Sequence, residues 1–148
     1  MKQIVLSLLV DNNPGVLARV ASLFSRRGYN IDSLSSGVTD SPKYSRITVA
    51  VSGDDQILEQ IRNQIQKLEE VRKIVVLEDK ESVCRELALV KVMADKREKQ
   101  DIIAIANVFR AKLVDVSVNS VMIEITGSQS KLDAFLNLLS DFEVLELV

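Results

Sequence analysis

A short polar segment, Asp11–Leu17, joins an apolar run to an amphipathic run and carries residues suited to binding a small anion. Asn13 suits the N-cap of a helix, and Pro14 suits the first helical position. Gly15 then leaves the amides of the first turn with no side chain over them. These amides are unpaired donors at the positive end of a helix, so the segment predicts a site for a carboxylate.

The polar residues around this segment favour a ligand that is both an acid and an amine. Asn12 carries an amide that donates and accepts hydrogen bonds. Asn30 begins the next predicted strand, where asparagine is unfavourable unless it has a hydrogen-bonding role. We expect the carboxylate of a zwitterion on the amides of residues 15–17 and its ammonium on the side-chain oxygens of Asn12 and Asn30. Its apolar side chain would lie against Ile31 and Leu17.

The same segment has simpler explanations. Asn-Pro-Gly is also ordinary turn chemistry, so a well-capped helix without a ligand explains it too. We expect no cation to reach a bound phosphate, because Arg19 stands a full helical turn beyond the loop. An enzyme of the acylphosphatase type is disfavoured for a similar reason, since it requires an arginine inside the loop. The acidic residues Asp11, Asp32 and Asp40 have no metal-ligand spacing.

The composition argues against several functions. A net charge of −2 and 4% aromatic residues disfavour a nucleic-acid partner. No apolar run reaches the roughly 18 residues of a membrane span, and no signal peptide precedes the strand that starts at Ile4. The single cysteine, Cys84, fits a cytoplasmic protein. The chain has no histidine, which removes the commonest general base and metal ligand.

Hydrophobic periodicity predicts the same order of elements twice. The first half has strands at Ile4–Val10, Tyr29–Val38, Tyr44–Val51 and Val71–Leu77, with one helix burying Leu17, Val20, Ala21 and Phe24 and a second helix starting near Asp54. The second half has strands at Glu86–Met93, Lys112–Val118, Val121–Thr126 and Val144–Val148, with helices at Asp101–Arg110 and after Ser128 or Ser130.

The predicted fold is therefore α+β, with two tandem ferredoxin-like βαββαβ domains. Residues 1–78 form the first domain, residues 79–84 a charged linker and residues 85–148 the second domain. One larger α+β domain is the alternative.

The two halves differ at the first helix start. The equivalent loop in the second half, Asp95–Lys99, is charged and has neither glycine nor proline, so only the first half has a ligand-type loop. The strand Ile4–Val10 is apolar at both alternations, which predicts cover on both faces of its sheet. A second copy of the domain would supply it. In such a dimer, Asn30 could approach the helix start of the other chain.

The segments Asp11–Leu17 and Leu23–Leu34 resemble the ACT domain of the small regulatory subunit of acetolactate synthase. Arg27–Ile31 is more specific than the proline–glycine loop, which many ACT domains share. The resemblance covers both domains and includes Ser45–Thr48, Leu58–Ile61, Gln66–Leu68, Arg85–Val92, Phe109–Arg110, Asp115–Val116, Ile125–Gly127 and Lys131–Phe135.

This resemblance implies a non-catalytic subunit that activates a separate catalytic subunit and confers feedback inhibition, usually by L-valine. The effector would bind between the ACT domains of a homodimer. The implied effector-binding residues are Asn12, Pro14, Gly15, Val16 and Leu17 of one chain, with Asn30 and Ile31 of the other. Thiamine diphosphate, magnesium and FAD would all be held by the catalytic partner and none by this chain.

The sequence departs from the family at two places. The family often has glycine where this chain has Ala111, and members usually continue past the last strand with a basic, glycine-containing tail. The sequence ends at Val148, so we expect it to be truncated relative to them. A stand-alone ACT-type sensor of another amino acid, regulating a different enzyme, is the alternative function.

Overall fold

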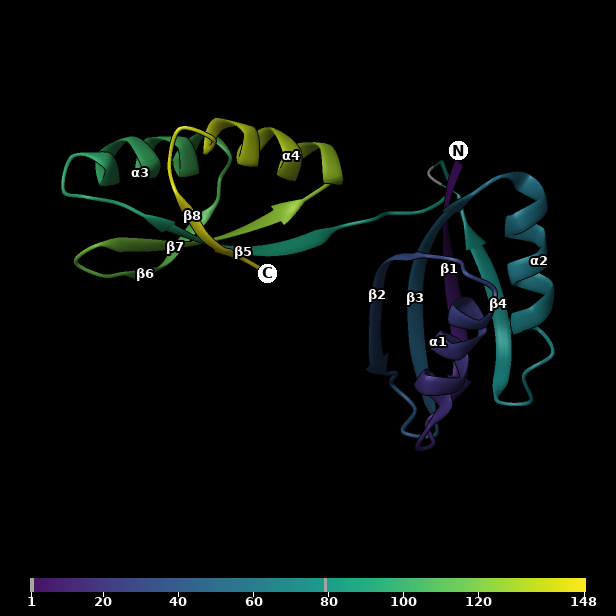
Figure 1. Ribbon diagram of the computed structural model, residues 1–148. Helices are drawn as coiled ribbons and strands as arrows, with labels where there is room; N and C mark the ends of the chain where they lie inside the picture. Colours follow the sequence, from purple (N-terminus) through teal and green to yellow (C-terminus); the bar gives the residue numbers. More distant parts are fainter. Residues whose placement is uncertain (1, 79) are drawn as a thin grey trace. The chain divides into compact units, whose positions relative to one another are not determined.

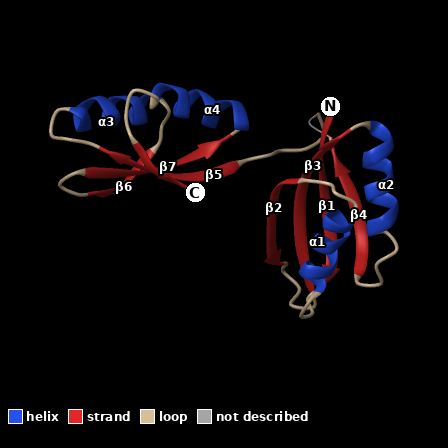
Figure 2. Cartoon of the chain, viewed as in Figure 1, coloured by secondary structure: helices blue, strands red, loops and turns tan. Residues whose placement is uncertain are grey.

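The computed structural model describes residues 2–78 and 80–148, which fold into two compact units, Met1–Ser82 and Val83–Val148 (Figure 1). Asp79, in the predicted linker 79–84, lies outside the described residues. In each unit the two helices lie on one face of a four-stranded antiparallel sheet (Figure 2).

The first unit has the sheet order β2-β3-β1-β4. Its elements are β1 (Lys2–Asp11), α1 (Val16–Arg26), β2 (Ile31–Val38), β3 (Tyr44–Gly53), α2 (Asp55–Ile65) and β4 (Val71–Leu77). Alternate residues of β1, namely Leu6, Leu8 and Val10, are buried against Val20 and Phe24 of α1. This period of two in the strand and four in the helix places the core between the sheet and the helices.

The second unit repeats this architecture with the order β6-β7-β5-β8. Its elements are β5 (Glu86–Met93), α3 (Glu98–Val108), β6 (Lys112–Val116), β7 (Ser120–Gly127), α4 (Gln129–Leu138) and β8 (Val144–Leu147). Val90 and Ile123 of the sheet are fully buried, and the rings of Phe109 and Phe135 meet edge to face at 5.4 Å. The order βαββαβ occurs twice, so the predicted α+β fold of two ferredoxin-like domains is confirmed.

The second face of β1 has only partial cover within the first unit. Val5 and Leu9 point away from the helices and are half-buried. Ser7 between them is 5% exposed, and its Oγ accepts a hydrogen bond of 2.7 Å from Nη1 of Arg46 on β3. The long side chain of Arg46 thus covers part of the face that the sequence predicted would need a partner.

The start of α1 differs from the prediction. Gly15, not Asn13, is the N-cap, with φ 85° and ψ −8°, and Pro14 lies outside the helix. The amide of Val16 donates to the carbonyl of Asn13, so these four residues form a β-turn. Proline second and a positive-φ glycine third are the marks of a type II turn.

This later helix start changes which side chains α1 buries. Val16, at 3% exposure, joins the core, whereas Leu17 is 42% exposed, so the prediction that Leu17 is a core residue is wrong. The turn fixes the phase of the helix, and the helix phase decides which of two adjacent apolar residues faces the sheet.

Two boundaries in the second unit also differ from prediction. The helix α3 starts at Glu98 rather than Asp101, because the side chain of Asp95 caps it. The strand β6 ends at Val116 rather than Val118, because the amide of Ser117 donates to the carbonyl of Ser120 and closes a turn.

Candidate functional site

The glycine turn, residues 12–17, presents backbone donors at the start of α1. In the described part of the chain no side chain caps this helix. Within residues 2–78 and 80–148, the amides of Leu17 and Ala18 have no hydrogen-bond acceptor. Gly15 has no side chain to cover them, and the positive end of the helix adds to their attraction for a negative group. The turn can therefore receive a carboxylate.

Asn12 fastens this turn to the hairpin between β2 and β3. Its backbone amide donates to Lys43 O at 2.9 Å, and its Nδ2 donates to Pro42 O at 2.9 Å. Its Oδ1 accepts from Ser45 Oγ at 3.0 Å. The amide group of Asn12 is therefore held in one orientation, and Oδ1 keeps one lone pair for a further donor.

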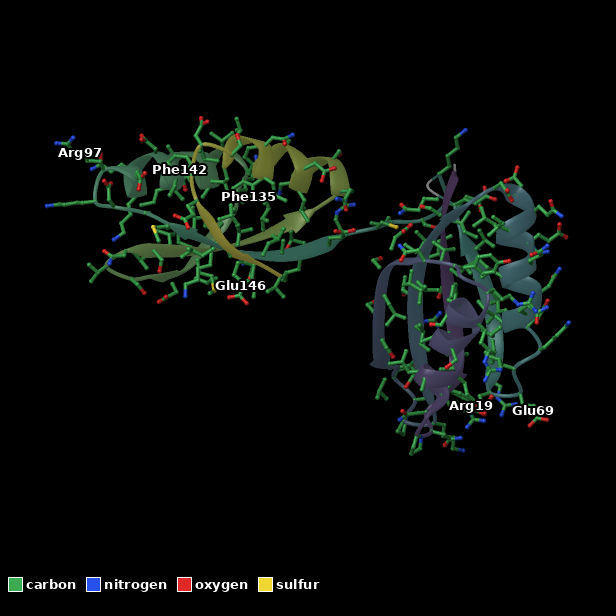
Figure 3. All side chains as sticks on the ribbon, viewed as in Figure 1. Arg19, Glu69, Arg97, Phe135, Phe142 and Glu146 are labelled. Atoms are coloured by element: carbon green, nitrogen blue, oxygen red, sulfur yellow. The ribbon has the colours of Figure 1, made fainter. Side chains whose placement is uncertain are left out.

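Two ion pairs join the residues on either side of the turn to Glu70, in the α2–β4 connection, and to Arg72, in β4. Arg72 donates to Asp11 through Nε to Oδ1 at 2.7 Å and through Nη2 to Oδ2 at 2.5 Å. These hydrogen bonds lower the pKa of Asp11 and raise that of Arg72. Arg19 pairs with Glu70, whose carbonyl accepts from the amide of Asp11 at 2.9 Å. Figure 3 shows Arg19 and the neighbouring Glu69 at this end of the unit.

Arg19 is closer to the turn than the sequence predicted. A Cβ built on Gly15 would lie 3.9 Å from Nη2 of Arg19, so the expectation that this arginine is too distant is wrong. Since α1 begins at Val16, Arg19 belongs to its first turn, and side chains on a helix lean toward the N-terminus. The guanidinium consequently lies beside the glycine.

Asn30 and Ile31, the other predicted site residues, lie at the start of β2 with an acidic neighbour. Asn30 Nδ2 donates to Asp32 Oδ1 at 3.2 Å. Asp32 Oδ2 accepts from Ser52 Oγ at 2.6 Å and from Gln3 Nε2 at 3.1 Å. The bond from Ser52, followed by that from Gln3, lowers the pKa of Asp32. The surface around Asn30 therefore carries the negative charge of Asp32, which these hydrogen bonds hold in place.

The sequence did not indicate that Asp32 lies beside Asn30 as a hydrogen-bonded carboxylate. Its three donors, Gln3, Asn30 and Ser52, come from different strands or strand ends. An open cleft of about 660 Å³ lies beside Asn30. Its lining residues are Gly28, Tyr29, Asn30, Ser52, Gly53, Asp54, Asp55 and Ile57. A small molecule that contacts Asn30 therefore has space in this cleft.

The two groups of predicted site residues lie at opposite ends of the sheet. Asp11, just before the glycine turn, is paired with Tyr44 of β3, whereas Ile31 is paired with Val51. These positions are seven residues apart along β3, which is about 23 Å at roughly 3.3 Å per residue. Asn12–Leu17 and Asn30–Ile31 of one chain therefore do not line the same site.

The helix start of the second unit is closed where that of the first is open. Asp95 Oδ1 accepts from the amides of Arg97 at 2.7 Å and Glu98 at 2.8 Å. Glu98 Oε2 accepts in return from the amide of Asp95 at 2.9 Å, which completes a capping box. The two amides lower the pKa of Asp95. The turn before α3 thus has its own carboxylate and no place for another.

Lys99 closes this turn further. It holds the position that Leu17 holds in the first unit, and its Nζ donates to the carbonyls of Ser117 at 2.7 Å and Val118 at 2.6 Å.

The described part of the chain contains no group of three or more acidic, cysteine or histidine side chains that could hold a metal ion. It also contains no helix that is long and apolar enough to cross a membrane.

The two ferredoxin-like units, with an open glycine turn only in the first, define an ACT-type protein. Residues 6–73 match the family described as the AHAS small subunit-like ACT domain, and residues 85–148 match the small subunit of acetolactate synthase. The chain belongs to the family of acetolactate synthase small subunits.

Individual relatives agree with this assignment. The chain is 51% identical to the acetolactate synthase small subunit of Mycobacterium bovis, over 96% of this chain and 84% of that protein. It is 53% identical to that of Mycolicibacterium smegmatis, with the same two coverages. The crystal structure of the small subunit from Thermotoga maritima superposes with a TM-score of 0.90 at 43% identity, covering 100% of this chain and 92% of that one.

Proposed function

We propose that this chain is a non-catalytic regulatory subunit that activates the catalytic subunit of acetolactate synthase and makes it subject to feedback inhibition by L-valine. The single observation that carries the sensing role is the open glycine turn of the first unit. Among the described residues the amides of Leu17 and Ala18 have no acceptor there, while the equivalent turn of the second unit is closed by Asp95. In this proposal the protein is cytoplasmic, and thiamine diphosphate, magnesium and FAD belong to the catalytic partner.

A homodimer formed through β2 would complete the site. β2 pairs only with β3 among the described strands, so its other edge is open to a second chain. Antiparallel pairing of two β2 strands about a two-fold axis through the middle of the strand would place Ile31 of one chain opposite Val38 of its partner. Val38 is paired with Ser45, which binds Asn12. Asn30 and Ile31 of one chain would thus approach the glycine turn of the other.

The side chains at this edge support such pairing. Leu34 and Val38 point to the helix side of the sheet, since they pair with Val49 and Ser45. They are 38% and 61% exposed, although both are apolar. A second copy would remove this surface from water, which stabilises the pair by about 25 cal/mol per Å² buried.

The chemistry of the completed site matches a zwitterion with an aliphatic side chain. The amides of Leu17 and Ala18 would receive the carboxylate. The ammonium would meet Oδ1 of Asn30, to which no described residue donates, beside the carboxylate of Asp32. The exposed side chain of Leu17 and the half-buried Ile31 offer apolar contact for the branched methyl groups.

Feedback inhibition follows only if valine binds the inhibited holoenzyme more tightly than the active one. The dimer interface is a suitable place for this preference, because a ligand that contacts both chains favours one relative position of the two first units. A ligand held by one chain alone would not distinguish such positions.

The direct experiment mixes this chain with a candidate catalytic subunit and measures acetolactate formation with and without L-valine. We expect the chain to stimulate the reaction and valine to reverse the stimulation. Capture of a thiamine-dependent enzyme on the immobilised chain supports the partner assignment. Stimulation that valine does not change would contradict the sensing role, and recovery of a different enzyme would favour a stand-alone ACT-type sensor.

A further inference from the structure

We propose that Arg19 binds the carboxylate of the effector and that Glu70 positions it for this task. The inference rests on the proposed function, because it assigns a further residue to the same amino-acid site. The sequence pattern gives no sign of this role, since Arg19 lies outside the Asn12–Leu17 segment.

The two terminal nitrogens of Arg19 face different partners. Nη1 forms the ion pair with Oε1 of Glu70, whereas Nη2 lies 3.9 Å from the position that a Cβ on Gly15 would take. A guanidinium has five N–H donors in a fixed plane, so pairing with Glu70 leaves donors on Nη2. A carboxylate held by the amides of Leu17 and Ala18 would lie within reach of these donors.

Glu70 is itself fixed at the base of the glycine turn. Its side chain is 17% exposed, and its carbonyl accepts from the amide of Asp11, the last residue of β1. Arg72, two residues further, binds the carboxylate of Asp11 in a bidentate manner. Glu70 in the α2–β4 connection and Arg72 in β4 therefore hold both sides of the turn, and the ion pair with Glu70 keeps the guanidinium of Arg19, whose side chain is 58% exposed, beside Gly15.

This arrangement also selects the charge of the ligand. Glu70 balances the charge of Arg19, so the turn attracts a single carboxylate through directed donors and carries no surplus positive charge for a phosphate dianion. A zwitterionic amino acid fits this balance. An amino alcohol, which has no carboxylate, would gain nothing from Arg19.

The test is calorimetric titration of the intact wild-type dimer and of variants with L-valine and with L-valinol, which lacks the carboxylate. We expect Arg19→Gln to weaken valine binding about tenfold, the loss of one charge-assisted hydrogen bond. The preference for valine over valinol should fall by the same factor. Arg26→Gln, in the last turn of the same helix, is the matched control and should bind valine as the wild type does.

Exchanging the two charges separates a role of Arg19 in ligand binding from a structural role in its ion pair with Glu70. The double variant Arg19→Glu with Glu70→Arg can rebuild the ion pair, so we expect wild-type thermal stability, but it places a carboxylate beside the turn and should not bind valine. Valine binding of wild-type strength in either Arg19→Gln or this double variant overturns the inference. A wild-type chain that binds no branched-chain amino acid overturns the proposed function, and the inference with it.

Discussion

Asp95 and Glu98 bind each other's backbone amides at the start of α3, whereas at the start of α1 the amides of Leu17 and Ala18 have no acceptor among the described residues. The second unit thereby gains a stable helix start and loses an anion site. The first unit, in which Gly15 is the N-cap of α1 and makes no side-chain cap, has the opposite properties. The same fold thus has an open helix start in the first unit and a capped one in the second.

The cap formed by Asp95 should make the stability of the second unit depend on pH. The pKa of Asp95 lies below its usual 3.8, so the unfolded chain binds the proton more readily. The stabilisation is therefore complete above about pH 4 and is lost as the pH falls through the lower, folded-state pKa. We expect Asp95→Ala to unfold at a lower temperature than the wild type at pH 7, with the difference shrinking toward pH 2.

The control for this cap is Asp95→Asn, which keeps an acceptor but not the charge. It should retain most of the stability at pH 7 and show a weaker pH dependence than the wild type. A difference between wild type and Asp95→Ala that stays constant from pH 7 to pH 2 would contradict the role of the ionised cap.

Substitutions at Gly15 should separate backbone strain from charge. Its φ of 85° is unfavourable for any other residue, so Gly15→Ala should lose about 1–2 kcal/mol of unfolding free energy yet remain folded. Gly15→Asn and Gly15→Asp have the same shape, but only aspartate puts a negative charge where we expect the ligand carboxylate. We expect the Gly15→Asp variant to bind valine at least tenfold more weakly than the Gly15→Asn variant, as measured by calorimetry.

Two outcomes of the Gly15 series would contradict the prediction. Equal valine affinities for the Asn and Asp variants would show that no carboxylate binds at the turn. Unfolding of Asp alone, with Asn folded, would show that the charge acts on the fold and not on the ligand. Circular dichroism of each variant distinguishes these outcomes.

Val38→Lys should dissociate the proposed dimer. The substitution puts a charge at the free edge of β2, where the partner strand would otherwise pair and cover an apolar side chain. Light scattering after size exclusion should show a monomer with unchanged circular dichroism, and valine binding should be lost with it. Val75→Lys on β4 at the opposite edge is the matched control and should leave the dimer intact; a monomer from both variants would contradict pairing through β2.

Arg110→Gly should stabilise the second unit by about 1 kcal/mol. Arg110 has φ 53° at the end of α3, where the amide of Ala111 donates to Ala106 O and that of Arg110 to Asn107 O, a Schellman motif. The same motif ends α1 with Gly28 at φ 68°. Glycine adopts this left-handed conformation without the steric cost that arginine has.

Thermal or urea unfolding measures this effect, and the reverse change, Gly28→Arg, should destabilise the first unit. A neutral or destabilising Arg110→Gly would show that the arginine side chain makes a compensating contact. The sequence indicated a departure from the family at Ala111, where many members have glycine. In the structure the residue with positive φ is the preceding one, Arg110.

The sequence by itself determined the repeated order of strands and helices. Alternation of period two in segments such as Leu6–Val10 and helical spacing such as Val20–Phe24 are local patterns, and each identifies one element without knowledge of its neighbours. Pro14 and Gly15 likewise indicated a turn from their own backbone preferences. The charged Asp95–Lys99 segment already distinguished the second helix start from the first.

Only the tertiary structure decided which residues meet at the candidate site. The type II turn set the phase of α1, which exposed Leu17 and brought Arg19 over Gly15. Strand register placed Ile31, which follows Asn30, about 23 Å along the sheet from Asp11, which precedes the glycine turn, so the proposed site needs two chains. Helix phase and strand register depend on the packing of distant segments, and no local pattern in the sequence encodes either.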